Sequence, residues 1–272
     1  MKYIVAVSGG VDSVVLLDMM TKVTGHELIV AHFDHGIRED STDDARFVAA
    51  LADRYGLKYA GKREELGKNA SEALARERRY SFLRELATHY DARIATAHHL
   101  DDLVETVAIN LKRGTGWRGL AALDSDVVRP LIDIPKQQLI RYARANGLKW
   151  REDSTNASDV YLRNRIRRKA STISHDTKRE LRALHSHQKH LKKEIEAEVY
   201  TLVGDGPEYS RYLLTHVPKQ VAVECLRYIT KGLLTRPQLE RCLLAIKTST
   251  AGSVYEAGSG VKISFSTRHF SL

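Results

Sequence analysis

The stretch YIVAVSGGVDS, residues 3–13, decides the fold of this chain. Its apolar first half, YIVAV, predicts a buried strand that ends just before the glycine pair. Asp12 and Ser13 then open the apolar segment VVLL, which predicts a helix with a capping residue at its start. A strand, a tight turn and a helix in this order are typical of the first unit of a parallel α/β sheet.

The turn SGG before a helix predicts a binding site for a polyanion. Two glycines let the backbone turn tightly and expose successive N–H groups, while the helix N-terminus adds a partial positive charge. Phosphate and pyrophosphate are the ligands that such a turn suits best. Asp12 lies beside the turn, so we expect Mg²⁺ between its carboxylate and the phosphates. The alternative is an ordinary turn rich in small residues.

Composition indicates a globular chain with room for more than one part. The 272 residues are enough for an α/β core and a small appended domain. A hydrophobic content of 43% and a charged content of 28% exclude a disordered chain. We expect neither a membrane span nor a signal peptide, because no apolar run is long enough. Cys225 and Cys242 have no motif spacing, which favours a cytoplasmic chain without disulfides.

The net charge of +9 predicts a polyanionic partner. Basic residues gather in the segment RNRIRRK, residues 163–169, and again between residues 178 and 193. A solvated helix face is the alternative for either cluster. Together with the excess charge of the whole chain, the clusters favour contact with nucleic acid.

Strand-like and helical segments alternate through the first half of the chain. Strands are expected at residues 2–7, 27–33, 57–61 and 94–97, and helices at 13–23, 41–56, 70–90 and 100–112. This alternation predicts a Rossmann-like parallel sheet with helices on both faces. Ligands of such sheets bind beyond the carboxyl ends of the strands, where Ser8, residues 32–35 and residues 98–102 fall.

The second half predicts a small, mainly helical C-terminal domain behind a connecting helix. Helical patterns cover residues 136–146, 175–203, 219–231 and 236–247, and a hairpin is expected from 253–256 and 261–266. The sequence GDGP, residues 204–207, breaks the longest of these helices. We therefore expect a main domain over 1–172, a connecting helix over 173–204 and a small domain over 205–272.

The loop SGGVDS resembles the pyrophosphate loop (PP-loop) of the N-type ATP pyrophosphatases, which split ATP between its α and β phosphates. Within that superfamily, residues 1–169 resemble the tRNA(Ile)-lysidine synthase family in five further blocks in the expected order. These blocks are AHFDHGIREDSTDDARFV (31–48), NASEALARERRYSFL (69–83), TAHHLDDLVETVAINLKRGTGWRGL (96–120), RPLIDIPK (129–136) and EDSTNASDVYLRNRIR (152–167). Leu103 stands where that family usually has Gln, which weakens any role for this side chain.

The resemblance implies an adenine nucleotide alpha-hydrolase-like fold and a ligase that uses ATP and Mg²⁺. Such a ligase joins L-lysine to C2 of the wobble cytidine of tRNA(Ile) with a CAU anticodon, through an adenylated intermediate. Residues 205–272 resemble the family's tRNA-binding domain only in length and basic character. The resemblance leaves the oligomeric state open, a homodimer included.

The same resemblance assigns roles to individual residues. The pyrophosphate would lie in the loop formed by Ser8, Gly9, Gly10, Val11, Asp12 and Ser13, with Mg²⁺ on Asp12. The adenosine would lie beside Ala31, His32 and Phe33. The lysine ammonium would be bound or deprotonated by Asp34, Asp102 or Glu105, whose order stays open, and Arg113 would clamp a phosphate or nucleotide. The anticodon backbone would be held by Tyr161, Arg163, Asn164 and Arg165.

Several motifs allow other interpretations. His98, His99, Asp101 and Asp102 could form a transition-metal cluster, but neighbouring carboxylates on a helix do not face one point and no cysteine joins them. The glycines of RGTGWRG, residues 113–119, follow a helix instead of opening one, which argues against a dinucleotide site. Trp117 could stack on a base or anchor its loop.

Two rival functions differ in class. A tRNA thiolation enzyme with an iron–sulfur cluster needs paired cysteines near its active site, whereas both cysteines here lie beyond residue 220. A catalytically silent RNA-binding module would tolerate loss of the phosphate loop, yet SGGVDS is intact. GMP, NAD and asparagine synthetases would not need the segment RNRIRRK.

Overall fold

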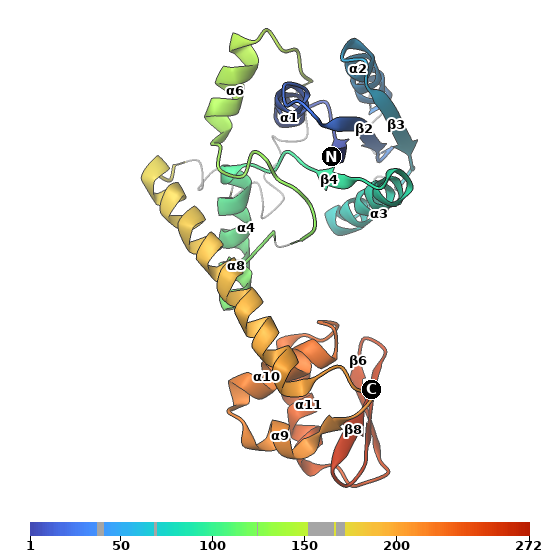
Figure 1. Cartoon of the computed structure of the whole chain (residues 1–272), viewed down its shortest axis with the longest axis vertical. Coiled ribbons are helices and arrows are strands. Elements are labelled where there is room, and N and C mark those ends of the chain that lie inside the picture. Colours follow the sequence, from blue (N-terminus) through green and yellow to red (C-terminus); the bar gives the residue numbers. More distant parts are fainter. Residues whose placement is uncertain (37–40, 68–69, 124, 152–165, 167–171) are drawn as a thin grey trace. The chain divides into compact units, whose positions relative to one another are not determined.

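The computed structural model describes two compact units. It covers residues 1–36, 41–67, 70–123, 125–151, 166 and 172–272. Unit 1 comprises Met1–Gln188 and unit 2 comprises Lys189–Leu272. The longest helix, α8 (His175–Val203), begins in unit 1 and ends in unit 2 (Figure 1).

Unit 1 is built on a parallel four-stranded sheet, as predicted. Its strands are β1 (Lys2–Ala6), β2 (Glu27–Asp34), β3 (Lys58–Arg63) and β4 (Arg93–Ala95), in the order β3-β2-β1-β4. All three strand pairs are parallel. A parallel bridge from Ala95 to Val128 adds one more segment beside β4. Because β1 lies between β2 and β4, the loops that follow these three strands meet at one edge of the sheet.

Helices cover both faces of this sheet. The helices α1 (Val11–Thr21), α2 (Ser41–Arg54) and α6 (Lys136–Ala145) pack on one face and α3 (Glu72–Tyr90) packs on the other, while α4 (Leu100–Lys112) and α5 (Trp117–Leu120) follow β4 in the chain. Tyr3, Val5 and Val7 of the first strand segment pack with α1, α2 and α6, whereas Ile4 packs with α3. Figure 1 shows α1 and α2 on one side of the sheet and α3 on the other. Such a sheet offers a ligand only the edge beyond its strands.

The first half of α8 is bonded to the rest of unit 1. Lys178 donates a hydrogen bond to Asp101 at 2.6 Å, and His185 Nε2 lies 2.6 Å from the carbonyl oxygen of Ala122. Both Lys178 and His185 are buried. This part of α8 therefore belongs to the main fold and is more than a connection.

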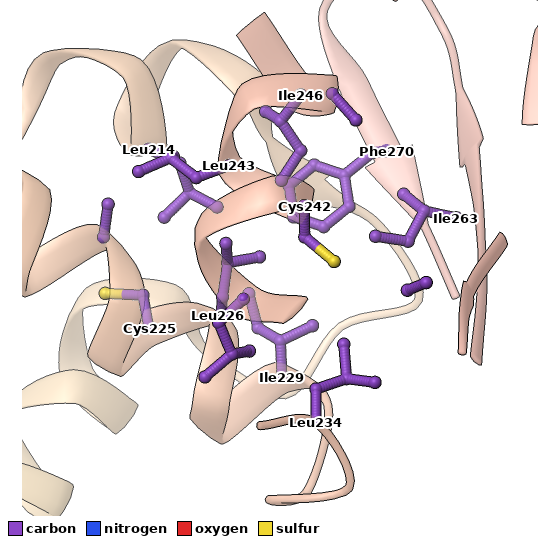
Figure 2. Close-up of a cluster of buried hydrophobic side chains, with 14 of the residues drawn as sticks. Leu214, Cys225, Leu226, Ile229, Leu234, Cys242, Leu243, Ile246, Ile263 and Phe270 are labelled. Carbon is purple, nitrogen blue, oxygen red and sulfur yellow. The ribbon is translucent and has the colours of Figure 1, made fainter. Parts of the chain in front are cut away.

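Unit 2 packs three helices on an antiparallel sheet. The helices are α9 (Arg211–His216), α10 (Lys219–Ile229) and α11 (Arg236–Thr248), and the strands are β5 (Tyr209–Ser210), β6 (Val254–Gly258), β7 (Val261–Phe265) and β8 (His269–Ser271). The strand order is β5-β8-β7-β6. Figure 2 shows Leu226, Leu243, Ile263 and Phe270 meeting in one apolar core. Strands β5 and β8, with two and three residues, are too short to produce a periodic sequence pattern, so only the hairpin β6–β7 was predicted.

The two cysteines lie in this core. Cys225 and Cys242 are both free and buried, and burial raises the pKa of each thiol. Thiols in such surroundings are unreactive. In the described ranges, no helix is both long and apolar enough to cross a bilayer.

One local prediction is wrong. Helix α1 begins at Val11, two residues earlier than predicted, and its N-cap is Gly10 instead of Asp12 or Ser13. Glycine has no side chain with which to cap, so the first amides of α1 keep their hydrogen-bonding capacity toward the loop. Asp12 lies in the first helical turn, where an acid also suits the helix dipole.

Candidate active site at the carboxyl edge of the sheet

The loop after β1 has the form that a phosphate site requires. Gly9 has φ of +92°, which favours glycine. The Ser13 hydroxyl donates a hydrogen bond to the Gly10 carbonyl at 2.9 Å and accepts one from the Ser8 amide at 3.2 Å. Ser8 and Ser13 thus close the loop from within. The first amides of α1, which an α-helix leaves without partners in its own backbone, suit an anion.

Asp12 is paired with a lysine that the sequence analysis did not select. Both carboxylate oxygens of Asp12 accept hydrogen bonds from Lys136 Nζ, at 2.6 and 2.5 Å. Lys136 is the first residue of α6, where the helix dipole disfavours a cation. That unfavourable position is the signal in the sequence that could have identified it. The pair places the Lys136 ammonium beside the phosphate loop.

His99 brings the exit of β4 to the loop. It caps α4: its backbone amide donates to Asp102 Oδ2 at 3.0 Å, and the Asp102 amide donates to His99 Nδ1 at 3.4 Å. Its side chain is 2% exposed. His99 Nε2 lies 3.7 Å from Asp12 and 3.4 Å from Asp102, without a hydrogen-bond partner among the described residues. Asp12, His99 and Asp102 therefore form one cluster.

Asp101 also lies beside His99, at 3.9 Å, but has two lysine partners besides. It accepts hydrogen bonds from the Lys136 amide at 2.8 Å and from Lys178 Nζ at 2.6 Å. Burial raises the pKa of Asp101, whereas these two hydrogen bonds lower it. The bonds together outweigh the burial, so the pKa lies below its ordinary value. Asp101 thereby joins the starts of α4, α6 and α8 beside the loop.

The exit of β2 contributes mainly backbone to the edge. Ala31, His32 and Phe33 are 2%, 5% and 8% exposed, so a nucleotide beside them would meet their main chain. His32 Nδ1 lies 2.8 Å from the Val7 carbonyl oxygen, which fixes β2 against the segment after β1. Asp34 accepts a hydrogen bond from the Gly36 amide at 2.9 Å and lies 3.4 Å from Arg63 of β3.

Two further predicted site residues lie within and at the end of α4. Glu105 is 1% exposed within α4. Arg113 is the C-cap of α4, and a helix of this length places it about 20 Å from the start that holds Asp102. The four predicted tRNA contacts lie outside the described residues: Tyr161, Arg163, Asn164 and Arg165.

Asp12 could supply one of the ligands of a Mg²⁺ ion. Magnesium is commonly bound by one or two carboxylates together with substrate phosphates. Asp12 fits the carboxylate role once Lys136 turns away, and phosphates in the loop would supply the other ligands. Within the described ranges, no three His, Cys, Asp or Glu side chains are arranged to hold a metal by themselves.

Comparisons with known proteins concern the family and the fold. The model of the PP-loop domain family matches residues 1–172. The tRNA(Ile)-lysidine synthase of Thermus thermophilus is 44% identical over 172 residues, covering 60% of this chain and 34% of that protein. That of Rickettsia typhi is 32% identical over 227 residues, covering 79% and 53%. The chain thus spans about a third to a half of the length of these relatives.

A solved structure supports the fold. The U34-tRNA thiolase from Methanococcus maripaludis, solved with its [4Fe-4S] cluster, superposes with a TM-score of 0.60 at 20% identity, covering 70% of this chain and 72% of that one. The likeness concerns the fold alone. Through residues 1–172, which contain the SGGVDS loop and the Asp12–His99–Asp102 cluster, this chain belongs to the PP-loop domain family.

Proposed function

We propose that the chain is a tRNA(Ile)-lysidine synthase, which joins L-lysine to C2 of the wobble cytidine in the CAU anticodon of tRNA(Ile). The modification would change the codon and amino-acid identity of the tRNA from Met to Ile. One observation carries the proposal: the PP-loop and the β4 exit, both within the region similar to lysidine synthases, meet at Asp12, His99 and Asp102.

In the first step, O2 of the cytidine would attack the α-phosphate of ATP and release pyrophosphate. The amides at the start of α1 would hold the departing phosphates. Lys136 would pass from Asp12 to these phosphates, because an ammonium is attracted by the larger negative charge. Mg²⁺ bound at Asp12 would neutralise further charge on the phosphates.

In the second step, the ε-amine of lysine would attack C2, and AMP would depart with O2. The amine has an ordinary pKa of roughly 10.4, so a carboxylate must take or hold its proton. Asp102 lies in the cluster beside the loop, and Asp34 lies at the neighbouring strand exit. We propose to test these two first, with Glu105, which is buried as Asp34 is, as the third candidate.

The RNA would be held by the basic segment 163–169 and by unit 2, which together would supply the polyanion contacts expected from a net charge of +9. Contacts to phosphates position an RNA without reading its sequence. The recognition of the cytidine itself would take place at the edge of the sheet.

The decisive experiment uses labelled lysine, ATP, Mg²⁺ and a tRNA(Ile) transcript with the anticodon CAU. We expect lysine to become attached to the RNA, with one AMP and one pyrophosphate formed for each lysine. A transcript with UAU is the matched control, because it offers no wobble cytidine. The proposal fails if the CAU transcript gains no lysine under conditions in which the protein is folded.

A further inference from the structure

Three side-chain hydrogen bonds join α1 to α6 at one constant spacing along the chain. The bonded residues are 124 positions apart in each pair: Asp12 with Lys136, Asp18 with Tyr142, and Lys22 with Asn146. The second pair lies six positions beyond the first on both helices, which is about 9 Å along each helix. The third pair joins the residues that cap the C-terminal ends of the two helices. Because the pairs come in the same order on both helices, α1 and α6 run in the same direction and fit together in one register.

Asp18 is the centre of this contact. It is 5% exposed. Its carboxylate accepts three hydrogen bonds, at 2.8, 2.8 and 2.7 Å, from Lys22 Nζ and from the hydroxyl groups of Tyr55 and Tyr142. Burial raises the pKa of Asp18, whereas these three bonds lower it, and together they outweigh the burial. The Tyr142 hydroxyl also accepts a hydrogen bond from Lys22 at 2.7 Å, so α6 is bonded to two charged groups of α1 at once.

These polar groups select the register of the two helices. Apolar side chains of both helices, such as Val14 and Leu139, lie in one cluster, but apolar attraction has no direction. A buried, hydrogen-bonded charge adds little stability relative to apolar packing, yet it can favour one arrangement over its neighbours. A slip of α6 by one turn, about 5.4 Å, would break its bond to Asp18 and carry Lys136 away from Asp12.

The register decides where the side chain of Lys136 lies. The Lys136 backbone amide donates to Asp101 Oδ2 at 2.8 Å, which holds the start of α6, and Tyr142 holds the same helix further along. With both anchors in place, the ammonium meets the Asp12 carboxylate in the first turn of α1. The Lys136 side chain is 32% exposed, so its ammonium has room to reach a ligand in the loop.

We propose that Asp18 and Tyr142 are positioning residues, which hold α6 in register on α1 so that Lys136 is ready for the phosphates of ATP. The inference rests on the proposed function, in which Lys136 passes from Asp12 to these phosphates. Both positioning residues lie six positions beyond the residues of the loop pair, so they act on the nucleotide through Lys136. A group that is already in place when its ligand arrives binds more tightly, because no binding energy is spent on ordering it.

The test compares Tyr142→Phe with Tyr55→Phe. Each variant removes one hydroxyl group that donates to Asp18, but Tyr142 belongs to α6 and Tyr55 directly follows α2. Isothermal titration calorimetry of the full chain with ATP and Mg²⁺ measures the Kd without RNA or lysine. We expect Tyr142→Phe to bind ATP about threefold to tenfold more weakly, since a displaced lysine loses part of a charge-assisted contact to phosphate. Tyr55→Phe should keep the wild-type Kd, and the melting temperatures of the two variants should agree within a few degrees.

Lys136→Met shows whether Tyr142 acts through the lysine. If it does, Tyr142→Phe should weaken ATP binding in the wild type but not in Lys136→Met, so the two losses should not add. The inference is overturned if the losses add, if Tyr142→Phe or Lys136→Met binds ATP as the wild type does, or if Tyr55→Phe loses as much affinity as Tyr142→Phe. Lysine attachment by the wild type is measured in parallel. Its absence, beside the expected ATP affinities, would count against the proposed function and not against the positioning role.

Discussion

Asp12 is the side chain on which the proposed activation step depends most. Asp12→Asn removes the negative charge at the start of α1 and keeps the size of the side chain. We expect tRNA-dependent pyrophosphate release to fall by about 10²–10³, or roughly 3–4 kcal/mol of transition-state stabilisation, with little change in tRNA affinity. Asp133→Asn is the control, since it removes a carboxylate that is paired with Arg182 at 2.7 Å. Near-wild-type turnover of Asp12→Asn would show that the activation step does not need the Asp12 carboxylate.

Lys136 should act on the nucleotide and not on the RNA. Lys136→Met removes the ammonium that lies 2.5 and 2.6 Å from Asp12. We expect the KM for ATP to rise about tenfold or more, because a charge-assisted contact to phosphate is typically worth about 1.5–3 kcal/mol. Lys136→Arg should restore part of the loss, whereas an unchanged KM in Lys136→Met would show that the lysine serves only to pair Asp12. Steady-state kinetics at varied ATP distinguish these outcomes.

Asp34 separates the two chemical steps. Without lysine, the first half-reaction should still release pyrophosphate and leave an adenylated RNA. We expect Asp34→Asn to impair lysine use more than this half-reaction, because its carboxylate lies at the exit of β2, next to the strand that carries the loop. Asp102→Asn is the comparison, since Asp102 lies beside His99 and the loop. Equal losses in both halves for Asp34→Asn would assign Asp34 to ATP or metal binding.

For single residues, the sequence predicts the form of a loop better than it predicts which side chains pair. The SGGVDS loop was predicted because turn chemistry is local, and two glycines with a following helix suffice. The pairing of Asp12 with Lys136 could not be predicted, since the residues are 124 positions apart and meet only through the packing of α1 against α6. The wrong cap at Asp12 has a local reason: an acid in the first helical turn and an acid at the N-cap look alike in a sequence.

Among the elements, α8 depends on Asp101 for its attachment to the candidate active site. Burial raises the pKa of Asp101, but the Lys136 amide and Lys178 lower it below the ordinary value of 3.8. A lowered pKa in the folded state means that the stabilisation is present above pH 3.8 and is lost as the pH falls through the folded pKa. Acid should therefore weaken this attachment only below about pH 4.

Lys178→Met tests the attachment. At pH 7 we expect a lower free energy of unfolding, by about 1–3 kcal/mol for a lost hydrogen bond between charged groups, and a melting temperature lower by a few degrees. Below pH 4 the difference from wild type should shrink, because the wild type then loses the same bond. Thermal unfolding of both proteins from pH 6 to 2.5 measures this difference. A difference that stays constant over the whole pH range would contradict the role of the Lys178–Asp101 bond. Lys189→Met, a charge loss beyond unit 1, is the control.

Periodic elements were predicted well and short ones were not. The helix over 175–203 and the strands β1 and β2 have apolar patterns long enough to recognise. Strands β5 and β8 and helix α9 are at most six residues long, and their pairing is fixed by contacts within unit 2.

For the whole molecule, the chain divides within α8. Val199 is 5% exposed in the core of unit 2, so a cut at residue 204 would separate this helix end from its core. A chain ending at Gln188 should keep its ATP affinity and lose tRNA affinity by about tenfold or more, because phosphate contacts are lost. Calorimetry with ATP and anisotropy with labelled tRNA measure the two. Unchanged tRNA binding would place all RNA contacts in residues 1–188.

The pairing of Lys136 with Asp12 has a consequence for the order in which ligands are added. Before nucleotide arrives, the ammonium already pairs with the carboxylate, so a free divalent ion would have to displace Lys136 to reach Asp12. On the proposed function, the phosphates of ATP would offer the lysine a stronger attraction, and their arrival would open Asp12 to a metal. We expect the metal to enter with its nucleotide, and a resting protein that is indifferent to free magnesium and calcium.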